Sequence, residues 1–419
     1  MTVQVSTLPS GLRVVTHQML AVESVSLGMW VHVGTRHERP EINGIAHMLE
    51  HMAFKGTRRR SARAIAEEIE DVGGHLNAFT SREFTAYHAT VLRGDETLAV
   101  DMLADILQNS VFDEDELERE RAVILQEIGQ TNDTPDDVVF DHFQEIAFPD
   151  QPVGRSVLGT AEIVSNMPRE ALQGYMDEHY SASRMVFSAA GNIQHDAMVR
   201  LVEDAFDHLP GGGGGHIGEP ARYVGGEFRE LRDLEQAHLV LGFEGIKFTD
   251  PDYYPLSVLS VVLGGGMSSR LFQEVREKRG LVYAIYTFAS SYSDSGLFGV
   301  YAGTGEAEAG EVMGVVCDLL RDLAGTIDSG ELKRARAQIR AGVLMSLEST
   351  ASRCEQLARQ LLVLGREIPV AEIAARIEAV DNDALDRIAR RIFSGPATFT
   401  ALGPVKGAPD FGAMTERLA

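Results

Sequence analysis

The stretch "LPGGGGGHIGEP", residues 209–220, lies almost at the middle of this chain of 419 residues. Its five consecutive glycines, residues 211–215, cannot hold a helix or a strand. The sequence therefore predicts a glycine-rich linker over residues 211–218, which joins an N-terminal half, residues 1–210, to a C-terminal half, residues 219–419. A linker at this position suggests that the two halves are related by duplication.

The two halves contain an internal repeat. The segment "IAEEIEDVGGHLNAFT", residues 65–80, aligns with "LFQEVREKRGLVYAIY", residues 271–286, at an offset of 206 residues. The apolar positions coincide, and Gly74 falls on Gly280. Both copies have the period of an amphipathic helix that ends at a glycine and is followed by a β-rich segment. The repeat predicts that the two halves have similar structures.

Strands and long helices alternate in each half. In the first half we expect strands at "VVTHQ", "SVSLGMWVHVG", "HLNAFT" and "FTAYHATVL", and helices over residues 43–52, 62–72, 95–108, 113–131, 169–179 and 196–208. The second half has strands near "HLVLGFEG", "LVYAIYTFASSY" and "GLFGVYAGT", followed by helices almost to its end. Strands with interspersed pairs of helices indicate an α+β fold. We therefore expect two similar halves, each a mostly antiparallel sheet with helices packed on one face.

The chain carries 38 Lys and Arg against 62 Asp and Glu, which gives a formal net charge of −24. This charge argues against nucleic-acid binding, because neutralising phosphates needs a basic surface. It is compatible with basic peptide substrates, although an acidic solvated surface alone explains it. Two cysteines, Cys317 and Cys354, make no disulfide framework. The sequence shows neither a signal peptide nor an apolar run of about 18 residues, so we expect a cytoplasmic, bacterial protein without a membrane partner.

The segment "GIAHMLEHMAFKGT", Gly44–Thr57, places three ionisable residues among apolar neighbours. On a helix His47 and His51, four residues apart, lie on one face and can converge on one ion. Glu50 lies at the edge of that face, where it can reach a metal-bound water. A hydrolytic zinc site takes three protein ligands and leaves one position for water, so a third ligand has to come from elsewhere. The alternative is a solvated helix face that carries two histidines.

A second cluster of charged residues lies on the expected helix "DEDELERERAVILQEIGQ". Glu120 and Glu127 are seven residues apart and therefore share one face of it. Val123, Ile124 and Ile128 are expected to give this segment a buried side. A carboxylate beside an apolar stripe is costly unless it is paired or metal-bound, so these two are candidates for metal chemistry. The other acidic residues of the helix are expected only to solvate its surface.

The spacing of these residues resembles a known family. His47-x-x-Glu50-His51, followed by Glu127 76 residues after His51, is similar to the inverted zinc motif of the pitrilysin family of metallopeptidases. The processing peptidases of that family and their bacterial homodimeric relatives are the members it resembles most. The matching stretches of the first half are "GIAHMLEHMAFKGT", "GGHLNAFTSREFTAYHATVL", "ERERAVILQEI" and "PVGRSVLG", and the second half adds "GGGMSSRLFQEVREKRGLVYAI".

The resemblance implies a role for each residue of the two clusters. His47, His51 and Glu127 would hold one Zn²⁺ per subunit, and Glu50 would be the general base. Glu120 would orient one of the ligands or tune its basicity. Bound zinc lowers the pKa of its water toward about 7 and polarises the scissile carbonyl. Glu50 would take the proton during attack and return it to the leaving amine.

The resemblance also implies residues that contact the substrate. The segment "HLNAFTSREFTAYHATV" is typical of a hairpin, and its first strand would be an edge to which an extended peptide adds as a further strand. Asn77 would contact the peptide beside the metal, with Ala78 next to it; without the family pattern we would assign Asn77 a local turn contact. In the second half, Tyr283 would donate a hydrogen bond to the oxyanion, and Arg276 would anchor substrate carbonyls or carboxylates. Alone, Arg276 and Tyr283 indicate only a surface arginine and a half-buried strand tyrosine.

The sequence leaves two classes of function open. The first is a zinc-dependent endopeptidase that hydrolyses short or unfolded peptides inside a closed chamber, as a homodimer to which Arg276 and Tyr283 are contributed across the interface. The second is a noncatalytic or partner-dependent subunit of a processing peptidase or a respiratory-complex-like assembly. The intact zinc motif argues against the second, because a structural subunit needs none of it. The segment "LGGGMSSRLF" lacks a full nucleotide fingerprint, so we exclude phosphate binding there.

Overall fold

The computed structural model describes residues 3–210 and 218–419. The expected linker, 211–218, therefore lies almost entirely outside the described residues, and the division of the chain at that point stays a prediction. The chain forms two compact units, and neither is one continuous stretch. The first unit consists of Met1–Gly129, Arg155–Glu219 and Met345–Glu367, and the second of Gln130–Gly154, Pro220–Leu344 and Ile368–Ala419.

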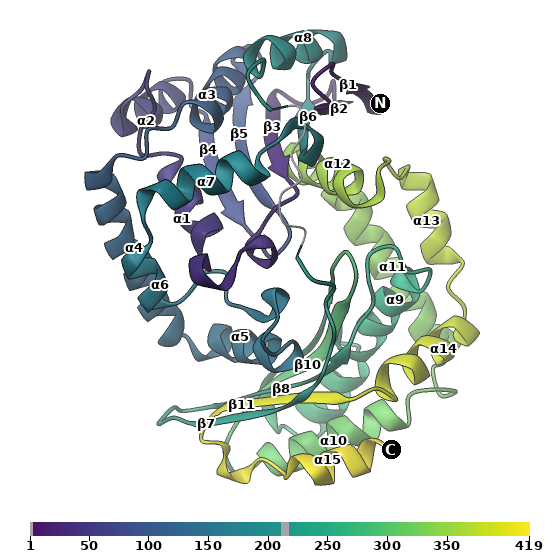
Figure 1. Cartoon of the computed structure of the whole chain (residues 1–419). Coiled ribbons are helices and arrows are strands. Elements are labelled where there is room, and N and C mark those ends of the chain that lie inside the picture. Colours follow the sequence, from purple (N-terminus) through teal and green to yellow (C-terminus); the bar gives the residue numbers. More distant parts are fainter. Residues whose placement is uncertain (1–2, 211–217) are drawn as a thin grey trace. The chain divides into compact units, whose positions relative to one another are not determined.

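The first unit is built on a six-stranded sheet with the order β1-β2-β6-β3-β5-β4 (Figure 1). Its strands pair antiparallel except for β2 and β6, which run parallel. The expected hairpin is present as β4 and β5, and β4 is an edge strand. The bounds are β1 (Val3–Thr7), β2 (Arg13–Gln18), β3 (Ser24–Val31), β4 (His75–Thr80), β5 (Thr85–Leu92) and β6 (Met185–Gly191).

Helices cover both faces of this sheet, and not one face alone as expected from the sequence. Successive side chains of a strand point to opposite sides, and both sides of β3 are packed against helices. On β3, Leu27 and Met29 belong to the core that also contains residues of most of the unit's helices. Trp30 faces the other way and packs in a second core with α12 (Thr350–Leu364), through Leu357 and Leu361. The other helices that begin in this unit are α1 (Ile45–Met52), α2 (Ala62–Glu70), α3 (Glu96–Gln108), α4 (Glu114–Asn132), α6 (Ala161–Asn166), α7 (Arg169–His179) and α8 (His195–Ala205).

The second unit repeats the plan with a five-stranded sheet, in the order β7-β11-β8-β10-β9. Its strands are β7 (Gly226–Leu231), β8 (Ala237–Glu244), β9 (Val282–Ser291), β10 (Gly296–Thr304) and β11 (Ala397–Gly403). One face packs against helices that include α9 (Tyr253–Gly264), α10 (Ala309–Arg321) and α14 (Asn382–Phe393). The opposite face packs against α5 (Pro135–Ala147), which inserts Val139 and Phe143 against Val240 and Leu402. The helices α11 (Ser329–Ser346), α13 (Val370–Glu378) and α15 (Phe411–Leu418) complete the unit.

The two sheets confirm the internal repeat. The order β2-β6-β3-β5-β4 corresponds to β7-β11-β8-β10-β9, and in each the first pair is parallel and the others are antiparallel. The α+β fold class with mostly antiparallel sheets is thus confirmed. Short 3-10 helices, such as η1 (Thr35–His37) and η2 (Pro40–Ile42), connect some of the elements. None of the helices in the described ranges is long and apolar enough to cross a membrane.

The alignment of the repeat that we expected is wrong by one residue after the helix. Gly73 (φ 67°) and Gly280 (φ 65°) both adopt the left-handed conformation where the helix ends, so Gly280 matches Gly73 and not Gly74. The additional residue lies in η5 (Phe272–Lys278), a π-helix, whose hydrogen-bonded turn holds one residue more than that of α2.

Candidate metal centre and active site

Helix α1 is oriented by its apolar residues. Five of its eight residues are at most 1% exposed and pack into the core of the first unit: Ile45, Ala46, Met48, Leu49 and Met52. The remaining three are His47, Glu50 and His51. Because residues three and four apart are neighbours on a helix, burial of the apolar set places these three side chains together on one side.

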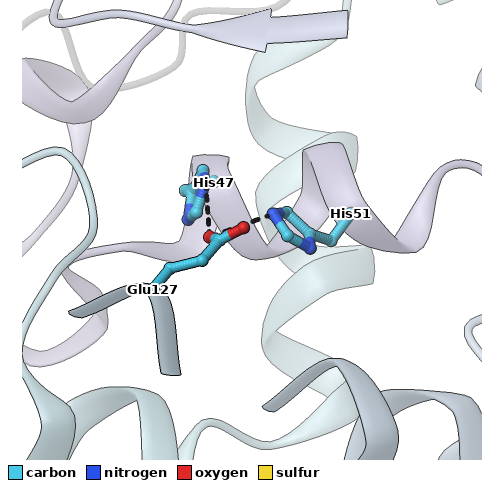
Figure 2. Close-up of side chains that lie close together, drawn as sticks. All are labelled: His47, His51 and Glu127. Atoms are coloured by element: carbon cyan, nitrogen blue, oxygen red, sulfur yellow. Dashed lines mark ion pairs between the residues drawn. The ribbon is translucent and has the colours of Figure 1, made fainter. Parts of the chain in front are cut away.

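The structure brings His47, His51 and Glu127 together, although α4 supplies Glu127 from far along the chain (Figure 2). The Oε2 atom of Glu127 lies 3.6 Å from His47 Nε2 and 3.5 Å from His51 Nε2. Two ligands bound about 2.0–2.1 Å from one tetrahedral zinc are roughly 3.3–3.4 Å apart. Both distances to Glu127 therefore match one shared zinc ion, and one donor atom from each of the three residues lies within 4.8 Å of the others. Three protein ligands would leave a fourth position for water or substrate.

Glu120 contacts the ring nitrogen of His51 that does not face Glu127, and it thereby orients the ring. It is 6% exposed, and its Oε2 accepts a 2.9 Å hydrogen bond from His51 Nδ1, while Lys55 Nζ lies 2.6 Å from its Oε1. Burial acts to raise the pKa of Glu120, but hydrogen bonds from Lys55 and His51 outweigh it, so this pKa is below its ordinary value. The ionised carboxylate accepts the proton of His51 Nδ1, which would leave the lone pair of Nε2 available to a metal ion.

His47 lacks an equivalent partner. Its Nδ1 atom is buried and has no hydrogen-bond partner among the residues that the structure describes. Burial, together with the nearby charge of His51, lowers the pKa of His47 to about 4. The ring is therefore neutral at physiological pH, which is the state in which an imidazole binds a metal.

Glu50 is half-buried on α1, and its carboxylate interacts electrostatically with His51 and Glu127. Burial raises its pKa and the charge of Glu127 adds to the rise, whereas hydrogen bonds with Thr80 and the charge of His51 oppose it. A carboxylate with a raised pKa is a better proton acceptor near neutral pH. Thr80 also donates a 3.3 Å hydrogen bond from Oγ1 to the carbonyl of Ala46, so the end of β4 is tied to α1.

The edge strand β4 places Asn77 and Ala78 near this helix. Strand β4 pairs with β5 alone in the described sheet, so its second edge has no strand partner there. Asn77 is exposed, and its Oδ1 accepts a 2.9 Å hydrogen bond from the N–H of Ala78, which is the local contact expected without the family pattern. An open strand edge beside α1 can accept an extended peptide through main-chain hydrogen bonds.

Arg276 and Tyr283 lie in the second unit and contact each other. The guanidinium carbon of Arg276 is 5.7 Å from the ring centre of Tyr283 and 4.9 Å from that of Phe272. Tyr283 is 73% exposed, more than the half-buried strand position considered from the sequence. Between β9 and β10, Val282 and Ala284 pair with consecutive residues, so Tyr283 is the unpaired residue of a β-bulge. Bulges of this kind redirect a side chain and are common beside active sites.

The expectation for the buried side of α4 is partly wrong. Ile124 is fully buried and Ile128 is partly buried, but Val123 is 39% exposed. The buried residues of this helix are Leu117, Glu120 and Ile124, which recur at the helical spacing. Sequence reasoning also missed Lys55 and Thr80; no sequence signal marked either, since each contacts the site only through the tertiary fold.

Known proteins share this chain's sequence and fold. Residues 13–161 match the family model described as insulinase (peptidase family M16), and residues 166–339 match the model described as the peptidase M16 inactive domain. A probable mitochondrial-processing peptidase subunit β of Arabidopsis thaliana is 41% identical over 429 residues, which cover 99% of this chain and 81% of the plant protein. An uncharacterized zinc protease of Rickettsia felis is 40% identical over 401 residues, which cover 96% and 97% of the two chains.

A chain of complex III₂ from Candida albicans, solved with Inz-5 bound, matches over 100% of both chains with a TM-score of 0.89. At 22% identity this likeness shows a shared fold alone. The two relatives close to 40% identity, in contrast, match along nearly the whole chain, and one is named a zinc protease. This chain therefore belongs to peptidase family M16, the insulinase or pitrilysin family, whose members include zinc proteases.

Proposed function

We propose that this protein is a zinc-dependent endopeptidase that hydrolyses short or unfolded peptides inside a closed chamber. The observation that carries the proposal is that Glu127 Oε2 lies 3.6 Å from His47 Nε2 and 3.5 Å from His51 Nε2, with Glu50 close enough to interact electrostatically with His51 and Glu127. Membership of a family that includes zinc proteases supports it independently. Nothing in the donor set disfavours zinc, since imidazole nitrogen and carboxylate oxygen are among its usual ligands.

The chain's own residues would divide the work as follows. His47, His51 and Glu127 would hold the metal, and Glu120 would orient His51 through its hydrogen bond with Nδ1. Zinc in this position supplies a water of low pKa and polarises the carbonyl of the scissile bond. Glu50 accepts the proton of the attacking water on a carboxylate oxygen and then donates it to the leaving amine.

The substrate would be held mainly through its backbone. An extended peptide adds to the open edge of β4, where Asn77 and Ala78 lie, and this mode accepts many sequences because every peptide has the same main-chain groups. Tyr283 and Arg276 contribute from the second half of a partner subunit in a homodimer, Tyr283 to the oxyanion and Arg276 to substrate carbonyls or carboxylates. The net charge of −24 is compatible with basic peptides as substrates.

Substitution of Glu50 tests the catalytic assignment. Glu50→Gln should lower kcat for a basic reporter peptide by at least about 10²–10⁴-fold, because a general base contributes that much. Zinc content, measured by mass spectrometry of the metal, should stay at one ion per chain. The exposed Glu114→Gln on α4 is the control and should retain full activity. Full activity in the Glu50→Gln protein would refute the assignment of the base.

The proposed sharing of the site is tested by mixing two inactive variants. Arg276→Ala should lower kcat/KM without loss of zinc. A mixture of Glu50→Gln and Arg276→Ala subunits should regain activity, because a mixed dimer contains one intact site. Absence of recovery in a mixture proven to contain mixed dimers would contradict the arrangement across the interface.

The second candidate function is a noncatalytic or partner-dependent subunit of a larger assembly. The fold shared with a chain of complex III₂ favours it. One measurement separates the two candidate functions. The purified chain, loaded with zinc, should cleave peptides in a chelator-sensitive reaction if it is an endopeptidase. It should not cleave them if it is a noncatalytic or partner-dependent subunit. We expect cleavage.

A further inference from the structure

A buried carboxylate, Glu38, lies at the start of the metal-binding helix without belonging to it. Glu38 is 1% exposed. Its Oε1 accepts a 2.9 Å hydrogen bond from the N–H of Ala46, and its Oε2 accepts two of 2.8 Å, from the N–H of Gly44 and from Asn43 Nδ2. The first N–H groups of a helix have no partner inside the helix. Glu38 satisfies two main-chain groups of this kind at the start of α1, where the N-cap residue Gly44 has no side chain to do so.

The segment that contains Leu158 and Gly159 packs against the same first turn of α1. Gly44 has φ 94°, and a Cβ atom there would lie 2.7 Å from the carbonyl oxygen of Leu158. A Cβ atom on Gly159 would likewise lie 2.4 Å from the carbonyl oxygen of Asn43. The backbones are therefore in direct contact, and only glycine fits at either position. This contact gives a structural reason for the motif "PVGRSVLG", which the proposed chemistry leaves unused.

Two side-chain hydrogen bonds join Glu38 and Asn43 to the segment Arg155–Gly159. Asn43 Nδ2 also donates to the carbonyl of Ser156 at 3.2 Å, and a guanidinium nitrogen of Arg155 donates to the carbonyl of Glu38 at 3.0 Å. We use the name socket for Glu38, Asn43 and the segment Arg155–Gly159. All of it lies in the first unit, and it surrounds the end of α1 nearest to His47.

An acidic residue suits this position for an electrostatic reason. The N-terminus of a helix carries a partial positive charge that favours an anion. Burial raises the pKa of Glu38 to about 7, while the hydrogen bonds from Ala46, Asn43 and Gly44 oppose the rise. The carboxylate receives donors on both oxygens. A glutamine would turn its own N–H₂ group toward one set of these donors, so it cannot replace all three bonds.

The socket matters for the site because of the difference between the two histidines. Glu120 holds His51 through Nδ1, whereas Nδ1 of His47 has no partner among the described residues. The position of the His47 ring thus depends on the backbone of the first turn of α1. Ala46, whose N–H is bound by Glu38, directly precedes His47.

We propose that Glu38 is a positioning residue of the active site, which fixes the first turn of α1 and thereby holds His47 at metal-binding distance from Glu127. The proposal rests on the proposed function, because it needs His47 to be a metal ligand. In this arrangement the two histidines are oriented in different ways, His51 through its side chain and His47 through its main chain.

The test compares two buried carboxylates of the first unit. Glu38→Gln should weaken Zn²⁺ binding by about 10–100-fold, the usual effect of losing a group that orients a ligand. Asp105→Asn is the matched control: Asp105 is 1% exposed and accepts bonds from Thr57, Arg60 and Asn109, none of which lies on α1. It should lower the melting temperature but leave zinc affinity within about twofold. Affinity is measured by competition with a chromophoric chelator, alongside thermal unfolding of the zinc-free proteins.

Two further readouts separate positioning from general damage. The Co²⁺-loaded Glu38→Gln protein should have an altered d–d absorption spectrum, and the Asp105→Asn protein an unchanged one. Should Glu38→Gln fail to fold, Asn43→Ala removes one of the three bonds and should weaken zinc binding by about 3–10-fold. Equal zinc affinities in wild type and Glu38→Gln, or equal losses in Glu38→Gln and Asp105→Asn, overturn the proposal. A wild-type protein that binds no zinc overturns the proposed function as well.

Discussion

Removal of the charge on Glu120 provides the most quantitative test of the proposed metal centre. In Glu120→Gln, the charge-assisted hydrogen bond of 2.9 Å to His51 Nδ1 becomes a neutral one at best. A hydrogen bond to a charged group contributes about 1.5–3 kcal/mol, and a neutral one about 0.5–1.5 kcal/mol. The difference of about 1–2 kcal/mol corresponds to roughly a 5- to 30-fold increase in the Kd for zinc. Glu120→Ala loses the whole bond and should raise the Kd by about 10–150-fold.

The partner of Glu120 offers an internal control. Lys55 Nζ lies 2.6 Å from the other carboxylate oxygen, but the lysine side chain is 31% exposed, so solvent reduces the contribution of this pair to at most about 1 kcal/mol. Lys55→Met keeps the bond between Glu120 and His51 and should raise the Kd less than about fivefold. Zinc affinity is measured by chelator competition at constant pH and ionic strength. A Lys55→Met effect larger than that of Glu120→Gln would refute the argument, because the carboxylate would then act through lysine and not through histidine.

Two further predictions concern the first unit. Burial, together with the neighbouring charged side chains, lowers the pKa of His37 to about 3. The neutral ring accepts a hydrogen bond from the N–H of Gly34 on Nδ1. The contribution of His37 to the stability of the folded protein is therefore complete above pH 6.5 and is lost as the pH falls toward 3. In zinc-free protein, His37→Asn should reduce the slope of unfolding free energy against pH between 6.5 and 4 by up to about 1.4 kcal/mol per pH unit, and an unchanged slope in urea titrations would contradict this. Leu357 on α12 is fully buried, so Leu357→Ala should destabilise the first unit by about 2–5 kcal/mol. Hydrogen exchange should show reduced protection of the amides of β3 and β6. Reduced protection in the second unit alone would refute the placement of this helix.

The sequence was informative where a pattern is local. The hairpin of β4 and β5 was predicted because its alternation and its turn lie within one short segment, and the bounds of α7 coincide with those expected. Strands β6 and β11 were missed, since each is buried on both faces and so lacks the alternation that indicates a strand. The interpretation of Val123 was wrong because an apolar residue next to a buried one need not share its face.

In the candidate site, too, the residues of local patterns were predicted and those that meet only through the tertiary fold were not. His47, Glu50 and His51 were found from the spacing on one helix. Glu127 was a candidate because it lies beside an apolar stripe, and the family resemblance gave it the role of a ligand. The structure places all four together. Glu38 gave no signal, because a residue that caps a helix from outside does not occupy the N-cap position that sequence rules recognise. Its partners become visible only when the chain has folded. The bulge at Tyr283 was likewise hidden, since a single unpaired residue leaves no mark on the composition of a strand.

The assignment of α12 to the first sheet has a consequence for synthesis on the ribosome. Helix α12 begins at Thr350, so the apolar surface around Trp30 is still bare when the preceding 349 residues have been made. An apolar sheet face that stays exposed during synthesis is prone to aggregation, and such exposure is typical of proteins that need chaperones to fold. For the same reason, a chain that stops before α12 should aggregate more readily than the full-length chain.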